Sequence, residues 1–138
     1  MLTDTHCHLY YEDLKNDLVG VLSRANELGV TRFICVGTNI SDSRECLSIS
    51  ENNNNIFASV GIHPHDAKDV NDRYIEDIYE LMEFGSMIAV GEIGLDYFRN
   101  ISDPDIQKNV FRNQMEIAQE LNRPVIFHNR DADEDVIE

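Results

Sequence analysis

The sequence lacks any apolar run that approaches the roughly 20 residues needed to span a membrane. No basic region followed by an apolar stretch stands near its start, so we expect no signal peptide. The three cysteines, Cys7, Cys35 and Cys46, are odd in number and follow no zinc-binding pattern, which argues against a disulfide framework. Together these absences predict a cytoplasmic protein with reduced thiols and no membrane partner.

Positive charge is also scarce. The 138 residues contain 11 Lys and Arg against 26 Asp and Glu, which gives a formal net charge of −15. Such a charge repels phosphate backbones at long range and argues against a passive nucleic-acid binder. It does not exclude a metalloenzyme that acts on phosphate, because bound cations reverse the local field. A surplus of carboxylates that simply keeps the protein in solution is the plainer explanation.

Short aliphatic blocks alternate with segments of helical periodicity along the whole chain. The length suggests one domain, and the hydrophobic fraction of 42% is sufficient for a core. Alternation with short connections predicts an α/β fold with a parallel sheet or barrel and covering helices. The expected strands are 3–9, 30–36, 56–62, 87–93 and 124–128, and the expected helices are 14–28, 42–50, 75–82, 106–121 and 133–138.

Four of the five histidines fall into two His-x-His pairs, His6 with His8 and His63 with His65. Each pair follows a predicted strand, and residues two apart on a strand point to the same face. His128 also ends a predicted strand. A neutral imidazole is the commonest protein ligand for a transition metal. Because sites in α/β sheets and barrels form at the carboxyl ends of strands, the pattern predicts a metal site there.

Glu92 lies in the apolar segment 89–94, where a buried carboxylate is costly unless it is paired or bound to a cation. Metal bridging explains this glutamate, and an ion pair with Arg99 or Arg130 is the alternative. His128 is interpreted as a metal ligand, with a core histidine bonded to the backbone as the alternative.

The turn at Pro64 is expected to expose at least one of His63 and His65. For His65, a capping role and a substrate-binding role are equally open. Arg130 follows His128 and either contacts a phosphate oxygen or forms an ion pair within a loop.

Two other residues of the opening motif have different expected roles. Asp4 either hydrogen-bonds to a metal-binding histidine and orients it, or simply begins the strand. Cys7 alternates with the two histidines, so its side chain faces away from theirs and is expected to pack against a helix.

These motifs together resemble the TatD-type deoxyribonucleases, a branch of the metal-dependent amidohydrolase-like barrels. The resemblance covers the chain from Met1 to about Asp135. It rests on four ordered blocks and one helical motif: 4–9 (DTHCHL), 60–65 (VGIHPH), 91–97 (GEIGLDY), Phe111-x-x-Gln114 and 124–130 (PVIFHNR).

The resemblance implies a TIM-barrel-like (β/α) fold and a two-metal site that hydrolyses phosphodiester bonds in DNA. By motif, His6 and His8 correspond to ligands of one metal and His128 to a ligand of the other. Glu92 corresponds to the bridging, catalytic carboxylate, and His63 to a contact with substrate phosphate. The ions implied are Mg²⁺ or Mn²⁺, and the histidine ligands also suit Zn²⁺.

The sequence departs from this family in extent. A barrel needs eight strands and some 250 residues, whereas about five of eight βα units are predicted here. A later His and a later Asp that usually complete the metal site have no counterpart. We therefore expect residues 1–138 to form a single partial barrel domain, the N-terminal portion of a family member.

This departure leaves three hypotheses for function. The first is a metal-dependent deoxyribonuclease. The alternative is a truncated, catalytically impaired fragment that binds metal weakly or assembles through its open sheet edge. The third is another metal-dependent hydrolase, acting on an amide or a phosphate monoester.

Overall fold

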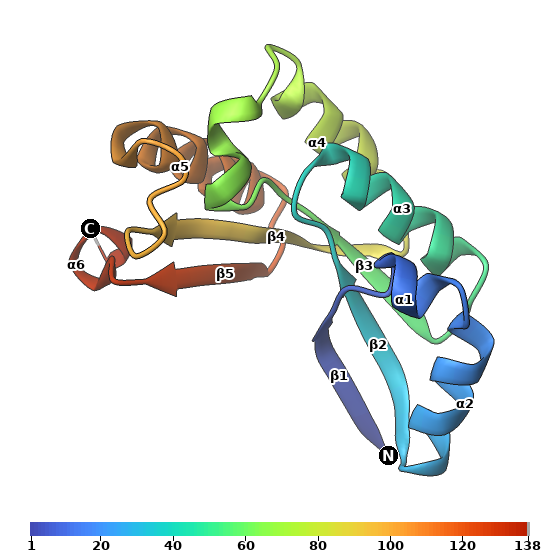
Figure 1. Ribbon diagram of the computed structural model, residues 1–138. Helices are drawn as coiled ribbons and strands as arrows, with labels where there is room; N and C mark the ends of the chain where they lie inside the picture. The colour runs from blue at the N-terminus through green and yellow to red at the C-terminus, as the bar shows by residue number, and fades with distance from the viewer. Residues whose placement is uncertain (138) are drawn as a thin grey trace.

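The computed structural model describes residues 1–137 and contains one five-stranded sheet (Figure 1). All neighbouring strands are parallel, and their order in the sheet follows their order in the chain. The two edge strands are therefore the first and the last. The strands are β1 (Leu2–Cys7), β2 (Val30–Val36), β3 (Ile56–Val60), β4 (Met87–Asp96) and β5 (Val125–Arg130).

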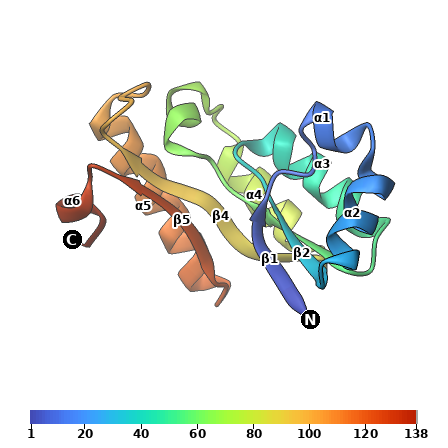
Figure 2. The same ribbon diagram turned by 60° about the horizontal axis from the view of Figure 1, so that its bottom comes forward.

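The helices between the strands connect consecutive strands and lie along one side of the sheet, and a last short helix follows β5, so the chain forms a half-barrel (Figure 2). This arrangement confirms the predicted parallel α/β architecture. The helices are α1 (Glu12–Lys15), α2 (Leu18–Glu27), α3 (Ile40–Glu51), α4 (Tyr74–Met82), α5 (Pro104–Glu120) and α6 (Asp133–Ile137), with a 3₁₀ helix, η1 (Pro64–Asp69). Within residues 1–137 there is no helix of the length and apolar character needed to traverse a bilayer.

The core lies between the central strands and the helices α3 to α5. Strands β3 and β4 are almost continuously apolar, and their large side chains are buried, among them Val60, Met87 and Ile93. The edge strands are much more exposed, as Leu2 on β1 and Phe127 on β5 show. Burial of apolar surface thus fixes the middle of the sheet and, with it, the strand ends where the polar residues collect.

Two strands extend further than predicted. Strand β4 continues through Asp96, because the side chain of Gln107 accepts a hydrogen bond from the Asp96 N–H at 2.8 Å and donates to its carbonyl at 3.2 Å. Strand β5 includes Asn129 and Arg130, which were expected in a loop, because they pair with Leu95 and Asp96 of β4.

Some helix boundaries also differ from expectation. The predicted helix 14–28 is divided at Asn16 and Asp17 into α1 and α2. Helix η1 follows Pro64, where only a turn was expected. Helix α5 begins with a side-chain cap, because the Asp103 carboxylate accepts from the Asp105 N–H at 2.9 Å. In the last predicted helix, Glu138 lies outside the described residues.

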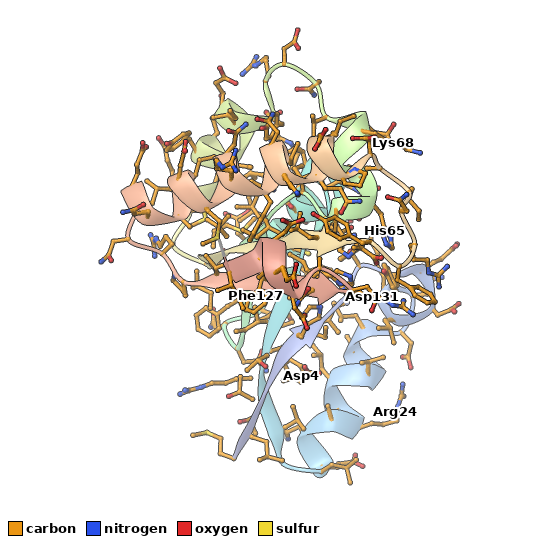
Figure 3. All side chains as sticks on the ribbon, turned by 90° about the vertical axis from the view of Figure 1, so that its left-hand side faces the viewer. Asp4, Arg24, His65, Lys68, Phe127 and Asp131 are labelled. Atoms are coloured by element: carbon orange, nitrogen blue, oxygen red, sulfur yellow. The ribbon has the colours of Figure 1, made fainter. Side chains whose placement is uncertain are left out.

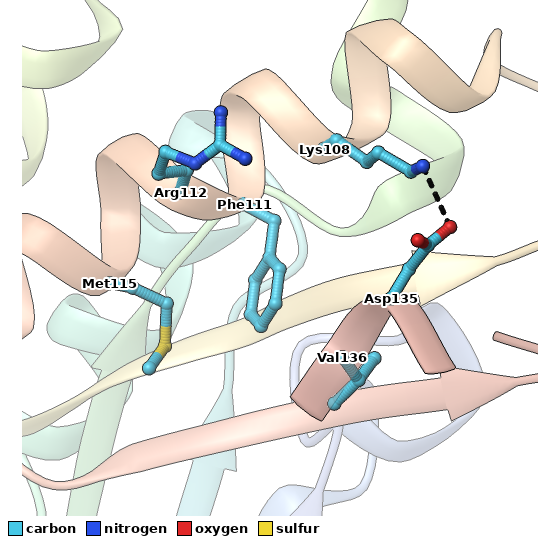
Figure 4. Close-up of a pocket in the computed structure, with 6 residues that line it drawn as sticks. All are labelled: Lys108, Phe111, Arg112, Met115, Asp135 and Val136. Carbon is cyan, nitrogen blue, oxygen red and sulfur yellow. Dashed lines mark ion pairs between the residues drawn. The ribbon is translucent and has the colours of Figure 1, made fainter. Parts of the chain in front are cut away.

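A hollow of about 460 Å³ lies between α5 and α6 (Figure 4). An ion pair of 2.7 Å between Lys108 Nζ and the Asp135 carboxylate spans it. No residue of the predicted metal site lines this hollow, so we assign it no part in that site. Its lining consists of Lys108, Phe111, Arg112, Met115, Asp135 and Val136.

Gln114 on α5 connects this helix to the end of β3. Its side chain is fully buried, accepts a hydrogen bond from the Ile62 N–H at 2.6 Å and donates to the Ile62 carbonyl at 3.2 Å. Replacement by leucine would leave both backbone groups buried without these partners. We expect Gln114→Leu to lower the free energy of unfolding by about 2 kcal/mol, measured by urea denaturation.

Gln119→Leu provides the matched control, because Gln119 lies on the exposed side of the same helix. Its free energy of unfolding should stay within about 0.5 kcal/mol of the parent value. Equal effects of the two substitutions would contradict the role assigned to Gln114.

Candidate metal centre

Glu92 and the histidine pair that ends β1 lie together. Ligand atoms of His6, His8 and Glu92 all lie within 4.8 Å of one another, and His6 Nε2 is 3.3 Å from Glu92 Oε2. Glu92 is only 8% exposed, whereas His6 is exposed. The structure therefore brings together three of the four predicted ligands across β1 and β4, which are not adjacent in the sheet.

The other oxygen of Glu92 faces a second group of histidines. Ligand atoms of Glu92, His63 and His128 also lie within 4.8 Å of one another, and His128 Nδ1 is 3.3 Å from Glu92 Oε1. The carboxylate is thus shared between two sets of nitrogens, one from the end of β1 and one from His63, which follows β3, and His128 on β5. Within residues 1–137 the side chains nearest the Glu92 carboxylate are histidines, and the alternative ion pair with Arg99 or Arg130 does not form.

Three consecutive carbonyls at the end of β2 hold residues of both groups. The Val36 carbonyl accepts from His8 Nδ1 at 2.8 Å, the Gly37 carbonyl from the Glu92 N–H at 2.8 Å, and the Thr38 carbonyl from the His63 N–H at 2.7 Å. Sequence analysis missed this role of β2, because backbone acceptors leave no signature in residue types. The end of β2 fixes the centre without contributing a side-chain ligand.

These contacts assign the hydrogens of two imidazoles. A carbonyl oxygen only accepts, so His8 carries its hydrogen on Nδ1 and keeps the lone pair of Nε2 free. His63 is the reverse, because its Nδ1 accepts the His65 N–H at 3.1 Å and caps helix η1. In its neutral form His63 therefore presents an N–H at Nε2, which suits hydrogen-bond donation rather than metal ligation. The side-chain cap of helix η1 is therefore His63, and the capping role considered for His65 does not occur.

Asp96 connects two of the histidines and was absent from the predicted site. Its Oδ2 accepts from His65 Nε2 at 2.7 Å and from His128 Nε2 at 3.1 Å, and its Oδ1 accepts from the Arg99 N–H at 2.7 Å. Burial at 1% exposure would raise the pKa of this carboxyl, but these donors outweigh burial and lower its pKa to about 2. Asp96 is therefore an anion that orients His128 by accepting from Nε2, the ring nitrogen that does not face Glu92.

A signal for Asp96 is present in the sequence. Asp96 lies four residues after Glu92, an even spacing that places both carboxylates on the same face of one strand. The predicted strand ended at Ile93, so the even spacing of Glu92 and Asp96 was not used to place Asp96 in the site.

The donor set fits a divalent cation. In the neutral ring of His128, Nε2 carries the hydrogen and donates it to Asp96. The lone pair of His128 Nδ1 therefore points toward Glu92 Oε1. Two acceptors at this separation repel unless a proton or a cation lies between them. Imidazole nitrogens with a carboxylate are ligands that Mn²⁺, Fe²⁺ and Zn²⁺ accept, and Mg²⁺ prefers the oxygens.

The remaining predicted residues lie around this centre. The Arg130 guanidinium carbon stands 3.9 Å from the ring centroid of Phe98, so it makes a cation–π contact, and the ion pair that was one of its two predicted roles does not form among residues 1–137. The Asp4 carboxylate accepts from the His6 N–H at 3.0 Å, so Asp4 shapes the backbone that carries the histidine. The Cys7 thiol donates to the Ile34 carbonyl of β2 at 3.3 Å, and the side chain packs against the hydrophobic core. Figure 3 shows Asp4 on β1 and His65 beside the end of β4.

His63 predicts a pH dependence of stability. Its burial, with His128 and His65 nearby, lowers its pKa from 6.5 to about 3. The unfolded chain binds this proton near pH 6.5 and the folded chain does not, so the free energy of unfolding falls as pH decreases from 6.5 toward 3. We expect metal-free protein to lose about 2 kcal/mol between pH 6.5 and 4.5 through this residue, measured by urea denaturation with EDTA present.

The variant His63→Asn separates this effect from the titration of carboxylates. Asparagine keeps an acceptor at the cap of η1 but does not titrate. Its free energy of unfolding should therefore change less with pH over the same interval. Identical pH profiles for the two proteins would show that His63 does not contribute.

Comparisons with known proteins agree with this geometry. The family described as TatD related DNase matches residues 3–138. An uncharacterized metal-dependent hydrolase, YabD of Bacillus subtilis, is 43% identical over 137 residues, which are 99% of this chain and 54% of that protein. The 3′-5′ ssDNA/RNA exonuclease TatD of Shigella flexneri is 35% identical over 131 residues, 95% of this chain and 50% of that one.

Among solved structures, the crystal structure of YJJV, a TatD homologue from Escherichia coli K12, superposes with a TM-score of 0.92 at 29% identity. The superposition covers 98% of this chain and 53% of that chain. This likeness confirms the predicted TIM-barrel-like fold. The chain spans about half the length of the curated relatives it matches.

Proposed function

The chain belongs to the TatD related DNase family, and from this premise we propose that it acts in metal-dependent hydrolysis of phosphodiester bonds in DNA. The observation that carries the proposal is Glu92, each of whose oxygens faces a histidine nitrogen at 3.3 Å. The relatives named as 3′-5′ ssDNA/RNA exonucleases support a nucleic-acid substrate.

We assign the ligands as the sequence predicts. His6, His8 and Glu92 would hold one divalent ion, and Glu92 with His128 would hold another; Mg²⁺ or Mn²⁺ are the first candidates and Zn²⁺ the next. Such ions activate water and offset the charge on the leaving oxygen. The chain itself keeps the lone pair of His8 Nε2 free and, through Asp96, holds His128 in place.

Substrate contacts follow from the remaining groups. The Nε2–H of His63 is a donor suited to a phosphate oxygen, because its Nδ1 is already used by the cap of η1. We assign His65 and Arg130 to the substrate side as well, since both keep part of their side chains accessible near the ends of β4 and β5. In this proposal His63 binds substrate and does not ligate metal.

The proposal is tested by incubating the protein with an end-labelled single-stranded DNA. We expect release of nucleotides that Mg²⁺ or Mn²⁺ stimulates and EDTA abolishes. Activity that survives the double substitution Glu92→Ala and His128→Ala would refute it, as would the absence of hydrolysis with all three metals. A parallel panel with a phosphate monoester and an amide separates this reaction from those of other metal-dependent hydrolases.

A second candidate is association through the sheet, which the two exposed edge strands favour. Within residues 1–137, β1 and β5 each pair on one side only, and each exposes a large apolar side chain, Leu2 and Phe127. Sedimentation that shows a folded monomer with metal-dependent hydrolysis would exclude a purely associative role.

The cytoplasmic location predicted from the unpatterned cysteines stays a prediction.

A further inference from the structure

Two exposed aromatic rings lie directly beside the metal centre. Tyr11 is 53% exposed and stacks on the His8 ring, with centroids 5.1 Å apart and the ring planes within 18° of each other. Phe98 is 60% exposed and carries the Arg130 guanidinium over one face. Tyr11 thus stands on the side of the β1 histidines, and Phe98, two residues beyond Asp96, stands on the side of His128.

Core packing does not account for these two rings, although Tyr11 also contacts Tyr10 edge-on, with centroids 5.0 Å apart. The neighbouring Tyr10 is half-buried, and its hydroxyl lies 3.2 Å from His8 Nδ1 and 3.4 Å from Thr38 Oγ1. Within residues 1–137 the Tyr11 hydroxyl has no such partner, and Tyr11, at the start of α1, makes no side-chain cap. Tyr11 and Phe98 therefore expose large apolar faces at the site without contributing to the core.

We propose that Tyr11 and the Phe98–Arg130 pair are stacking sites for nucleobases, on the two sides of the phosphate that the metal centre receives, and that they select single strands over duplexes. This inference rests on the proposed function and names the form of its substrate. Every base has a π-face, so such stacking tolerates any sequence, and it contributes about 1–3 kcal/mol per base. Bases within a duplex are already stacked and do not offer these faces.

The charge of the chain makes this mode of binding necessary. Proteins that hold single strands usually add a positively charged groove to the aromatic contacts. Here the formal net charge is −15, and the Lys108 ammonium in the hollow beside α5 is paired with Asp135. Stacking of a base on the Tyr11 or Phe98 ring does not depend on phosphate attraction, so it keeps its strength on an acidic surface. Arg130 adds one cation beside the second ring.

The test uses tryptophan fluorescence, because the sequence contains no tryptophan. Tyr11→Trp and Phe98→Trp each introduce a single fluorophore at a proposed stacking site. Phe84→Trp is the matched control: Phe84 is 43% exposed but lies before the start of β4, at the opposite end of the strand from Phe98. Each variant is titrated in EDTA with a single-stranded oligonucleotide, with an abasic oligomer of equal length, and with a duplex.

We expect the single strand to quench Tyr11→Trp and Phe98→Trp but not Phe84→Trp, and the abasic oligomer and the duplex to quench none. In fluorescence anisotropy, Tyr11→Ala should weaken binding of the single strand about tenfold, while Tyr11→Phe retains it. Tyr11→Ala and Tyr11→Phe should bind the abasic oligomer with equal affinity.

The inference is overturned if the single strand fails to quench both stacking-site variants, or if the abasic oligomer quenches them equally. These measurements exclude metal, so they do not depend on catalysis. Hydrolysis without quenching rejects the stacking sites and leaves the proposed function standing. Quenching without hydrolysis rejects the proposed function and upholds the stacking sites.

Discussion

Replacing Glu92 by glutamine is expected to abolish metal-stimulated hydrolysis and to weaken Mn²⁺ binding by at least about a hundredfold. Glutamine keeps the size of the side chain but removes the negative charge shared by the two groups of histidines. It also replaces one of the two acceptor oxygens by an NH₂ donor, which cannot ligate a cation. One substitution therefore removes a ligand from one proposed ion and the negative charge from both.

The binding constant is measured by isothermal titration calorimetry on protein first stripped with EDTA. Glu116→Gln, an exposed carboxylate on α5, is the control and should bind Mn²⁺ as the parent does. Thermal melting of the metal-free proteins verifies that each variant is folded. Mn²⁺ binding by Glu92→Gln within threefold of the parent value would remove Glu92 from the ligand set.

Replacing Gly94 by alanine is expected to lower the free energy of unfolding by about 4 kcal/mol, and the melting temperature by about 15 °C. Gly94 on β4 is in register with His128 on β5, and a Cβ at Gly94 would overlap the His128 carbonyl oxygen. That oxygen belongs to the backbone, so it cannot rotate aside. The φ of Gly94 is +143°, a conformation that alanine rarely adopts.

The same substitution should also widen the metal centre, because β5 must move away from β4 to relieve the overlap. His128 would then recede from Glu92 and Asp96, and Mn²⁺ affinity should decrease along with stability. Gly85→Ala is the control, since a Cβ there has no atom within 4 Å and its stability should change by less than about 0.5 kcal/mol. A melting temperature of Gly94→Ala within a few degrees of the parent would contradict this packing argument.

The sequence alone predicted the parts of this molecule that depend on local pattern. Alternation of apolar blocks with helical periodicity predicted five parallel strands, and the spacing of His6 and His8 predicted that both reach one site at the end of β1. The apolar surroundings of Glu92 indicated that a partner must compensate its burial, and the partners are His6 and His128. Each of these inferences uses residues close together in the chain.

The parts that escaped prediction depend on contacts between distant segments. Asp96 became a partner of His65 and His128 because Gln107 extends β4 to reach it, and that bond joins a helix to a strand end. Arg130 was expected to meet an anion, but the exposed ring of Phe98 offers it a cation–π contact instead.

The end of β2 has a consequence for how the centre assembles. Val36, Gly37 and Thr38 hold His8, Glu92 and His63 through backbone carbonyls, and these bonds use neither Nε2 of His8 nor the Glu92 carboxylate. The atoms that position these residues are therefore separate from the atoms assigned to the ions, so ion binding would not compete with these bonds. Affinity is therefore partly encoded in a strand whose side chains never touch the ion. A survey of side-chain substitutions would overlook it, because no replacement at these three positions removes a carbonyl.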